Sequence, residues 1–380
     1  MATIGAYGLV LYAFSVFIEP IKAETGWSNG ALSGAFSLGL LVSGIGAIFT
    51  GRFLDQIGSR PVMLGSLLAG SALLLTAASA GSLLVFVIGW GVGGGIIGAG
   101  LFYNVTMALT TRLYDNDRTK AFAILTFIGG LASPIYFPLA GFLVEQWGWR
   151  IALRGQVALL FLFVLPAATL IRGGRAKSDT GKDSVSVSGV TIIREAFRVS
   201  QIRRMVAAFS LMLGAMVAVQ VHHVPAIQAA GLSLATATTV AAIRGFLSLP
   251  GRALLSPIVN FTGVRGAILV MYAAMIIGLL ALVMAGPFIF IMGFAVITGL
   301  TYGTILPLHG LYAAEVFGEK RIGTLMGAQS TVISLFAALG PVVLGLTIDL
   351  TDGYGLLLIT SALITGLAMW LLGAKKKMLA

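Results

Sequence analysis

Long apolar runs, separated by short charged or Gly- and Pro-containing breaks, dominate the pattern of hydrophobic and polar positions along the chain. An α-helix rises about 1.5 Å per residue, so about seventeen or more apolar residues cover most of the roughly 30 Å of hydrocarbon in a bilayer. Runs of this length occur twelve times, at residues 3–20, 31–53, 61–78, 83–109, 119–144, 151–171, 205–224, 234–259, 267–284, 288–313, 323–348 and 355–372.

These runs favour helices, because backbone groups in lipid must find hydrogen-bond partners within their own segment. They are also too long and too uniformly apolar for the strands of an outer-membrane barrel. The pattern therefore predicts an all-α membrane protein with twelve transmembrane helices.

The composition agrees with this prediction. Of the 380 residues, 58% are hydrophobic and 10% are charged, and the mean hydropathy is +1.01. These values exclude a water-soluble enzyme, a secreted disulfide scaffold and a disordered chain. The chain has no cysteine, so thiolate chemistry, Cys-based zinc sites and disulfides are excluded as well.

The distribution of Lys and Arg predicts the orientation in the membrane. With the N-terminus inside, most of the 24 Lys and Arg fall on the predicted cytoplasmic loops and the C-terminal tail, whereas the predicted outer loops hold only Lys22, Arg150 and Arg154. Because cytoplasmic loops carry an excess of Lys and Arg, we expect a multi-pass inner-membrane protein with both termini cytoplasmic. The net charge of +11 then needs no nucleic-acid partner, although it should attract anionic lipid headgroups.

One long polar stretch, residues 172–204, separates the first six runs from the last six. It is rich in Ser, Gly and charged residues, as linkers are. We therefore expect an N-terminal six-helix bundle over residues 1–171, a cytoplasmic linker over 172–204 and a C-terminal six-helix bundle over 205–380.

An internal repeat relates the two predicted bundles. An offset of 205 positions aligns Pro20 with Pro225, Gly26 with Gly231, Ser28 with Ser233, Gly46 with Gly251, Gly58 with Gly263 and Arg60 with Arg265. A shift of 203 pairs Arg118 with Arg321 and Pro138 with Pro341. Two pseudo-symmetric halves in parallel register are typical of a transporter that binds its substrate between the halves, near the middle of the membrane.

The segment from Gly51 to Arg60, Gly-Arg-Phe-Leu-Asp-Gln-Ile-Gly-Ser-Arg, resembles motif A of the major facilitator superfamily, G-x-L-x-D-x-x-G-x-R, with Phe53 in place of the usual Leu. A glycine at position 58 permits a tight turn, and the acid and the arginine can pair with charges and helix ends on the inner face. The resemblance implies a major facilitator fold and a conformational gating motif made of Gly51, Asp55, Gly58, Arg60 and Arg118.

A narrower resemblance is carried by residues 17–20 followed by 26–28, by Gly148-Trp149-Arg150, and by 222–225 leading to 231–233. These segments are similar to those of monocarboxylate-transporter-like and oxalate/formate-antiporter-like members. The resemblance places Arg252 where related monocarboxylate transporters carry a substrate-binding arginine. Relatives that couple transport to protons through a nearby acid would have it at Ser248, so proton symport through that carboxylate is not implied here.

Two arginines fall within the eighth apolar run, and a charge at the bilayer centre costs at least about 2.5 kcal/mol. Arg244 and Arg252 lie on either side of the expected midplane, and with Ser248 they are spaced i, i+4, i+8 along one helical stripe. We expect this stripe to face a water-filled cavity. The alternative is that each arginine is structural and caps backbone carbonyls or bonds to a neighbouring helix.

All thirteen Asp and Glu residues fall near the predicted inner or outer side, and none in the middle of a run. The negative partner of the two arginines is therefore expected to be the substrate, and a guanidinium holds a carboxylate well through two parallel hydrogen bonds. We expect a secondary transporter that moves a small organic anion, a mono- or dicarboxylate, by alternating access. The alternative is an exporter of amphiphilic or drug-like compounds in which the arginines are structural.

Other functions find less support in the sequence. It contains no P-loop, no metal-ligand cluster and no nucleophile beside a base, so we expect no ATP, metal, cofactor or catalytic site and no enzyme activity. A sensor or a membrane enzyme has no sequence feature in its favour. The expected partners are the anion and the surrounding lipid, with the chain acting as a monomer.

Several polar residues on the predicted inner helices are weaker candidates, each also suited to helix packing. His309 shares a helical face with Tyr302 and is a candidate for handling a proton, although it could equally be a hydrogen-bonded structural residue. The predicted substrate-binding residues are Arg252, Arg244, Ser248, Tyr302, Tyr136, Tyr103, Asn104 and Gln329.

Overall fold

The computed structural model describes residues 1–113, 118–170, 194–317 and 322–373, and the regular structure within these ranges is helical. We call residues 1–170 the first half and residues 194–373 the second half. The helices of the first half are α1 (Ala2–Tyr7), the π-helix η1 (Gly8–Tyr12), α2 (Ala13–Thr25), α3 (Asn29–Ile57), α4 (Ser59–Ala78), α5 (Leu83–Leu101), α6 (Tyr103–Leu113), α7 (Arg118–Gly130) and α8 (Ala132–Leu170). Those of the second half are α10 (Ser200–Ala229), α11 (Leu234–Gly251), the 3-10 helix η2 (Arg252–Leu254), α12 (Leu255–Val283), α13 (Phe288–Phe317), α14 (Ile322–Thr351) and α15 (Gly355–Gly373).

Ten helical segments of the described chain are long and apolar enough to cross a membrane, which confirms the all-α, multi-pass architecture. Two of them, Lys120–Thr169 and Leu234–Val283, contain 50 residues each, or roughly 75 Å of helix, about two and a half times the thickness of a hydrocarbon core. Each contains one glycine with non-helical backbone angles, Gly148 and Gly263. If each break divides its segment into two spans, the count becomes twelve. The twelve-helix count therefore stays a prediction that is compatible with these two breaks.

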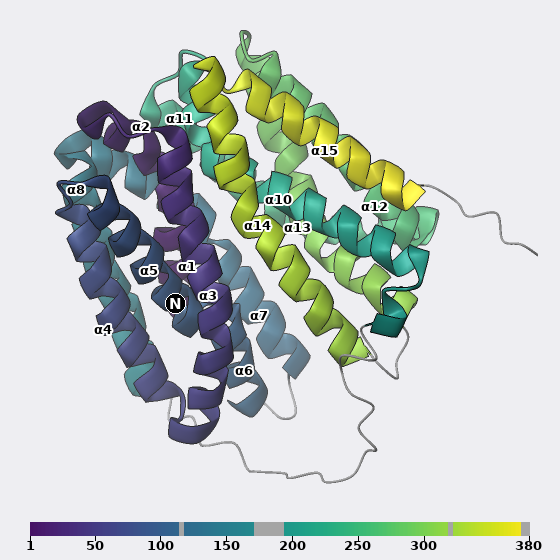
Figure 1. The fold of residues 1–380 in the computed structure, drawn as a ribbon, viewed down its shortest axis with the longest axis horizontal. Helices are drawn as coiled ribbons and strands as arrows, with labels where there is room; N and C mark the ends of the chain where they lie inside the picture. The colour runs from purple at the N-terminus through teal and green to yellow at the C-terminus, as the bar shows by residue number, and fades with distance from the viewer. Residues whose placement is uncertain (114–117, 171–193, 318–321, 374–380) are drawn as a thin grey trace, which may run out of the picture.

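The helices of the first half gather on one side of the molecule and those of the second half on the other (Figure 1). The halves meet through α3 against α14 and through α8 against α11. Helix α10 begins at Ser200, inside the stretch predicted as linker, and residues 171–193 of that stretch lie outside the described ranges. The predicted boundaries at 171 and 205 therefore stay predictions.

Glycines bring neighbouring helices of the first half into close contact. A methyl group added at Gly93 of α5 would lie 2.9 Å from the carbonyl oxygen of Gly70 in α4. One added at Gly95 would lie 3.0 Å from the carbonyl oxygen of Gly39 in α3. Small residues at such contacts let helix backbones approach in lipid, where packing takes the place of the hydrophobic effect.

The internal repeat is visible in the backbone. Residues with φ in the left-handed region form three pairs at offsets of 204 or 205 positions: Gly26 with Gly231, Gly58 with Gly263, and Gly148 with Asp352. Ser28 and Ser233 are the N-caps of α3 and α11, and each side chain accepts a hydrogen bond at 3.2 Å from the backbone N–H three residues on. The equivalence predicted from the sequence therefore holds for turns and helix caps.

We call the end of the molecule that carries the turns at Gly26 and Gly231 the Gly26 end. There, Asp349 of α14 reaches the first turn of α3. Its Oδ1 accepts hydrogen bonds from the backbone N–H of Asn29 at 2.8 Å and from Asn29 Nδ2 at 3.0 Å, and its Oδ2 accepts one from the N–H of Gly30 at 2.7 Å. A carboxylate at this place satisfies helix N–H groups that have no partner within the helix and complements the helix dipole.

The repeat places a second acid in the equivalent position. Glu145 of α8 lies 204 positions before Asp349, and its Oε1 accepts a hydrogen bond at 3.0 Å from the N–H of Ala235, in the first turn of α11. We call these two acid-to-helix contacts the latches. Two more hydrogen bonds join the halves at this end, Tyr354 to Glu19 at 2.5 Å and Ser33 with His222 at 2.9 Å.

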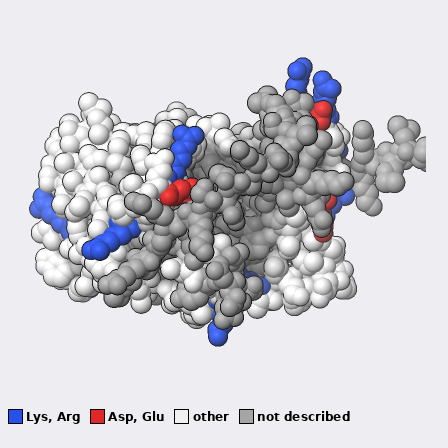
Figure 2. All heavy atoms as spheres, turned by 90° about the horizontal axis from the view of Figure 1, so that it is seen from below, with Lys and Arg blue, Asp and Glu red and all other residues white. Residues whose placement is uncertain are grey.

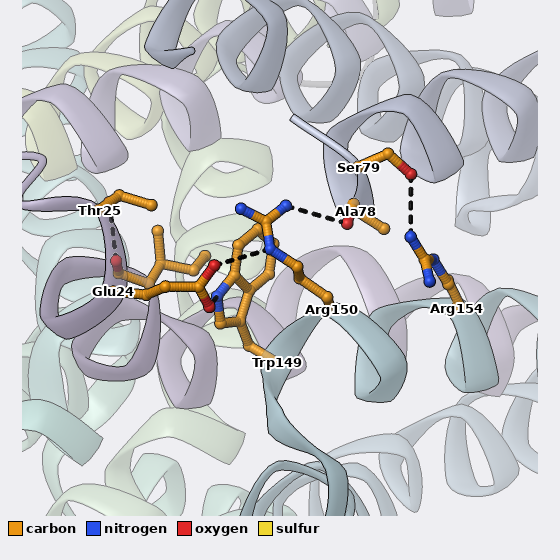
Figure 3. A network of polar contacts seen from close by, with 8 residues as sticks. Glu24, Thr25, Ala78, Ser79, Trp149, Arg150 and Arg154 are labelled. Carbon is orange, nitrogen blue, oxygen red and sulfur yellow. Dashed lines mark hydrogen bonds and ion pairs between the residues drawn. The ribbon is translucent and has the colours of Figure 1, made fainter. Parts of the chain in front are cut away.

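A polar network at the same end holds the first half together (Figure 3). Glu24 of α2 accepts hydrogen bonds from Trp149 Nε1 at 2.7 Å and Arg150 Nε at 2.8 Å, and Arg150 also donates to the carbonyl oxygen of Ala78, at the end of α4, at 3.2 Å. Gly148, with φ of 73°, turns the chain so that the next two side chains face α2 and α4. The Gly148-Trp149-Arg150 segment therefore has a structural role.

The opposite end, which we call the Gly58 end, carries the turns at Gly58 and Gly263. Figure 2 shows this face from below, with several Lys and Arg side chains and fewer Asp and Glu among the described residues. Arg52 and Arg60 flank the turn at Gly58 and are both exposed. Arg265, the repeat partner of Arg60, donates through Nε to the carbonyl oxygen of Leu372 at 2.8 Å.

The predicted gating motif lies at the Gly58 end. Gly58 ends α3 with φ of 86°, as the tight turn requires. Asp55 is exposed and has an interaction partner. Arg118 begins α7, and its side chain lies outside the described part of the structure. A gating role for this motif, including Gly51 and Arg60, stays a prediction.

Candidate functional site

A cavity of about 620 Å³ lies between the two halves. The first half lines it with an aromatic wall, which we define as Tyr7, Tyr12, Phe36, Tyr103 and Phe137. The second half lines it with a polar wall, which we define as Gln220, Arg244, Ser248, Arg252 and Tyr302. This volume is within the range of roughly 300–1,000 Å³ that is typical of small-molecule sites.

Interrupted helices surround the cavity. The first span changes to a π-helix over Gly8–Tyr12, α5 and α6 meet at Phe102, and α11 ends in the 3-10 turn Arg252–Leu254 that follows Pro250. Such breaks are tolerated at membrane depth where the chain lines a cavity, and π-helical turns are frequent at functional sites. At each of these breaks, side chains that line the cavity lie at or beside the break: Tyr12 at the first, Tyr103 at the second and Arg252 at the third.

Arg244 is the innermost charge of the polar wall, with 4% of its surface exposed. Its Nε donates to Thr298 Oγ1 at 2.9 Å and one terminal nitrogen donates to Gln220 Oε1 at 2.8 Å. Its guanidinium carbon lies 4.9 Å from the centroid of the Tyr302 ring, within cation–π distance. Each of these partners is neutral, so the positive charge is solvated but not compensated by them.

Two glycines of α13 explain how Arg244 reaches these partners. A methyl group at Gly299 would lie 2.5 Å from the main-chain oxygen of Arg244, and one at Gly303 would overlap the main-chain oxygen of Ser248. Only glycine therefore allows α11 to pack this closely on α13. The close packing brings the arginine beside Thr298.

Arg252 lies in η2, where α11 is interrupted, and its side chain is exposed to the cavity. One terminal nitrogen lies 3.4 Å from the main-chain oxygen of Thr126, in α7 of the first half. A hydrogen bond this long is weak. Arg252 therefore bridges the halves loosely and keeps most of its donors for another partner.

The structure brings together five of the eight predicted binding residues. Arg244, Ser248 and Arg252 all line the cavity, as the predicted stripe requires, and so do Tyr302 and Tyr103. The Ser248 hydroxyl donates to the main-chain oxygen of Gly245 at 2.7 Å, so its proton is occupied and its oxygen is left to accept a hydrogen bond.

The other predicted residues are not among those that line the cavity. Tyr136 is fully buried, and its ring occupies the space beside Gly8 of the π-helix. Asn104 is exposed on α6, and Gln329 is buried on α14. The positions of Tyr136 and Gln329 suit packing between helices, whereas Asn104 lies on the surface of α6.

His309 is also outside the cavity. Its Nε2 makes a hydrogen bond at 2.7 Å with the Tyr272 hydroxyl, and its ring stacks on Phe209 at 3.7 Å between centroids. The residue is 5% exposed. The prediction that His309 handles a proton therefore finds no support in its position, because the ring is enclosed among residues of the second half.

Four members of the aromatic wall and Gln220 were missed by sequence reasoning. Tyr7 and Tyr12 line the cavity at the π-helix, which no pattern in the sequence predicts, and Phe36 and Phe137 are among many aromatic residues in apolar runs. Gln220 did have a signal, since it is an uncharged polar side chain in the middle of the apolar run 205–224.

Comparison with known proteins agrees with this architecture. Residues 1–341 match the profile of the Major Facilitator Superfamily. The chain is 24% identical over 372 residues to the uncharacterized MFS-type transporter YcxA of Bacillus subtilis (strain 168), with 94% of this chain and 88% of that protein covered. It is 26% identical over 360 residues to monocarboxylate transporter 13 of Bos taurus, with 91% and 80% covered.

Two further matches concern a partial relative and a solved structure. Multidrug resistance protein D of Escherichia coli (strain K12) is 29% identical over 153 residues, which cover 40% of this chain and 37% of that protein. The crystal structure of the nucleoside transporter NupG superposes with a TM-score of 0.80 at 14% identity, covering 99% of this chain and 98% of that one. An identity this low shows the shared fold alone.

The motif between α3 and α4, the paired turns of the repeat and the cavity between the halves therefore agree with a match that spans most of the sequence. The resemblance predicted from the motifs is confirmed, and monocarboxylate transporters are among the relatives. The chain belongs to the Major Facilitator Superfamily and is a multi-pass membrane transporter.

Proposed function

We propose that this transporter moves a small organic anion, a mono- or dicarboxylate, which Arg244 and Arg252 bind between the halves. The observation that carries the proposal is that both guanidiniums line one cavity, while their hydrogen-bond partners are the neutral groups of Gln220, Thr298 and Thr126. Among the described residues, no carboxylate forms an ion pair with either arginine. A carboxylate substrate would supply the missing charge.

The chemistry of the polar wall suits this role. A guanidinium presents donors in a planar fork that matches the two oxygens of a carboxylate, and in a partly dry site such hydrogen bonds are stronger than in water. Arg244 is held in place by its two neutral partners, whereas Arg252 is free to adjust to the ligand. The hydroxyls of Tyr302 and Tyr103 can donate to the same anion.

The ends of the molecule support a direction for the access path. The latches and two more hydrogen bonds join the halves at the Gly26 end, while exposed arginines surround the turn at the Gly58 end. By the positive-inside rule, the Gly58 end and both termini face the cytoplasm of an inner membrane. The described conformation is then closed outward, and alternating access requires the latches to open.

The transporter needs no partners for this cycle beyond its substrate and the surrounding lipid. We propose that it works as a monomer, on gradients or by exchange, without ATP. The polar wall contains no carboxylate or histidine that would couple transport to a proton.

A second candidate function is the export of amphiphilic compounds. It is favoured by the five rings of the aromatic wall and by the partial match to a protein named for multidrug resistance. In that function the arginines would be structural, and neutral amphiphiles would bind with the same affinity as anionic ones.

Uptake of small carboxylates into proteoliposomes tests the proposal. We expect Arg244→Gln and Arg252→Gln each to reduce carboxylate-driven counterflow at least about tenfold, since each removes a charge-assisted contact of about 1.5–3 kcal/mol. Arg154→Gln is the matched control, because Arg154 donates to Ser79 outside the cavity. Unchanged counterflow in both cavity variants, with the protein still folded, would refute carboxylate binding by the arginines.

A further inference from the structure

The two walls of the cavity differ in chemistry. All five members of the aromatic wall belong to the first half, and among the lining residues of that half none is charged. Both lining arginines belong to the second half, where Tyr302 is the one aromatic lining residue. A ligand that touches both walls must therefore be apolar and flat on one side and anionic on the other.

We infer that the substrate is an arylcarboxylate, whose ring packs on the aromatic wall while its carboxylate binds Arg244 and Arg252. This inference rests on the proposed function and narrows its substrate class. An acid of two to four carbons would leave more of the 620 Å³ cavity to water than an arylcarboxylate and would bring no ring to the aromatic wall.

The rings of the aromatic wall are already ordered. Tyr7 stacks on Phe102 with 4.1 Å between centroids, and its ring centroid lies 5.0 Å from that of Tyr103. Tyr12 and Phe137 pack at 5.6 Å in a tilted arrangement. Aromatic side chains arranged in this way favour binding of a ligand ring in an offset-stacked or edge-to-face orientation. Because their neighbours hold them, a ligand ring would bind with little loss of side-chain freedom.

Gln220 marks where the carboxylate binds. Its Oε1 accepts from Arg244, and since a guanidinium only donates, the amide orientation is fixed. The amide nitrogen is enclosed without a hydrogen-bond partner in the described structure, on a residue that lines the cavity and is 5% exposed. A buried donor without an acceptor is unfavourable, and a carboxylate beside Arg244 would satisfy it.

Binding measurements on the purified full chain test this inference with three matched probes: benzoate, propionate and benzamide. We expect benzoate to bind about tenfold more tightly than propionate, since one additional aromatic contact and its buried area contribute an increment of this size. Benzamide keeps the ring but lacks the charge, and it should bind at least about tenfold more weakly than benzoate.

A double variant separates ring recognition from carboxylate recognition. Tyr7→Leu combined with Phe137→Leu should remove most of the preference for benzoate and leave propionate binding within about twofold, because both changes spare the polar wall and the Tyr103 hydroxyl. Retained propionate binding also shows that the variant is folded. Phe261→Leu is the control, since Phe261 is 91% exposed and lies outside the cavity.

The outcomes distinguish this inference from the proposed function. Equal affinities for benzoate and propionate would overturn the arylcarboxylate and leave carboxylate transport standing. Equal affinities for benzoate and benzamide would overturn both and favour the exporter. Failure of every carboxylate to bind would also overturn both.

Discussion

Neutralising Asp349 should open the Gly26 end. Its two carboxylate oxygens accept three hydrogen bonds from the start of α3. In Asp349→Asn, one oxygen becomes an amide nitrogen that faces an N–H donor, so at least one bond is lost. The charge that strengthens the others and complements the helix dipole is lost as well. We expect the closed state to lose about 2 kcal/mol, which lowers the closed-to-open ratio roughly thirtyfold.

Disulfide crosslinking across the α3–α14 contact measures this ratio. The chain contains no cysteine, so Gly34→Cys and Val342→Cys introduce the only thiols. A Cβ at Gly34 would lie 4.0 Å from Cγ2 of Val342, close enough for a disulfide to form in the closed state. Adding Asp349→Asn should slow crosslinking in proportion to the loss of the closed population.

The control for this measurement is Asp352→Asn. Asp352 is an exposed acid at the same end with φ of 49°, a conformation that Asn also adopts. Crosslinking at the original rate is expected in this variant. Alkylation of the two thiols by a soluble maleimide reports the open state, which grows with the fall in the ratio even where the closed state dominates. If Asp349→Asn is folded, crosslinks as fast as the parent and is alkylated no faster, the contact with α3 does not hold the halves together and the reasoning is wrong.

Three further effects follow from other contacts. Glu145→Gln removes the charge from a latch with one hydrogen bond of 3.0 Å at an exposed site, so the same crosslinking assay should report a shift below about 1 kcal/mol. Gly8→Ala would push a methyl group into the ring of Tyr136, and thermal unfolding in detergent should show a loss of about 1–3 kcal/mol. Gly148→Ala places a side chain at φ 73° and ψ 165°, a nearly glycine-only conformation, and should cost about 1–3 kcal/mol in the same assay. Gly155→Ala, with open space around its Cα, is the control for both and should leave stability nearly unchanged.

Features that depend on segment length and on turn residues were predictable from the sequence. The apolar runs correspond to the observed helices, although α3 extends four residues beyond the predicted end at 53. The residues that the repeat aligns in sequence also have equivalent conformations: Gly58 and Gly263 are both turn glycines, and Ser28 and Ser233 are both helix N-caps. These residues act locally, through a glycine φ or a cap hydrogen bond, so the chain itself carries the information.

Which face of a helix meets the cavity was predictable only where a charge decided it. The cost of placing Arg244 in lipid forces its stripe toward the cavity, and the structure agrees. Tyr302 and His309 are seven positions apart in a helix that is apolar all round, and their shared face led to the prediction of a shared site. Pro307 interrupts the backbone hydrogen bonding between them, and Tyr272 of the neighbouring α12 takes up the histidine instead. The sequence of one helix does not indicate which side chain of a neighbouring helix will bind its polar residues.

The separation of aromatic and polar walls has a consequence for engineering selectivity. Because each wall belongs to a different half, and the halves turn at equivalent positions, the aromatic and the polar side chains of the cavity are encoded in separate stretches of the gene. Hybrids that join this second half to the first half of another member of the superfamily would keep both arginines and exchange the aromatic side chains, so the two kinds of contact can be recombined in blocks.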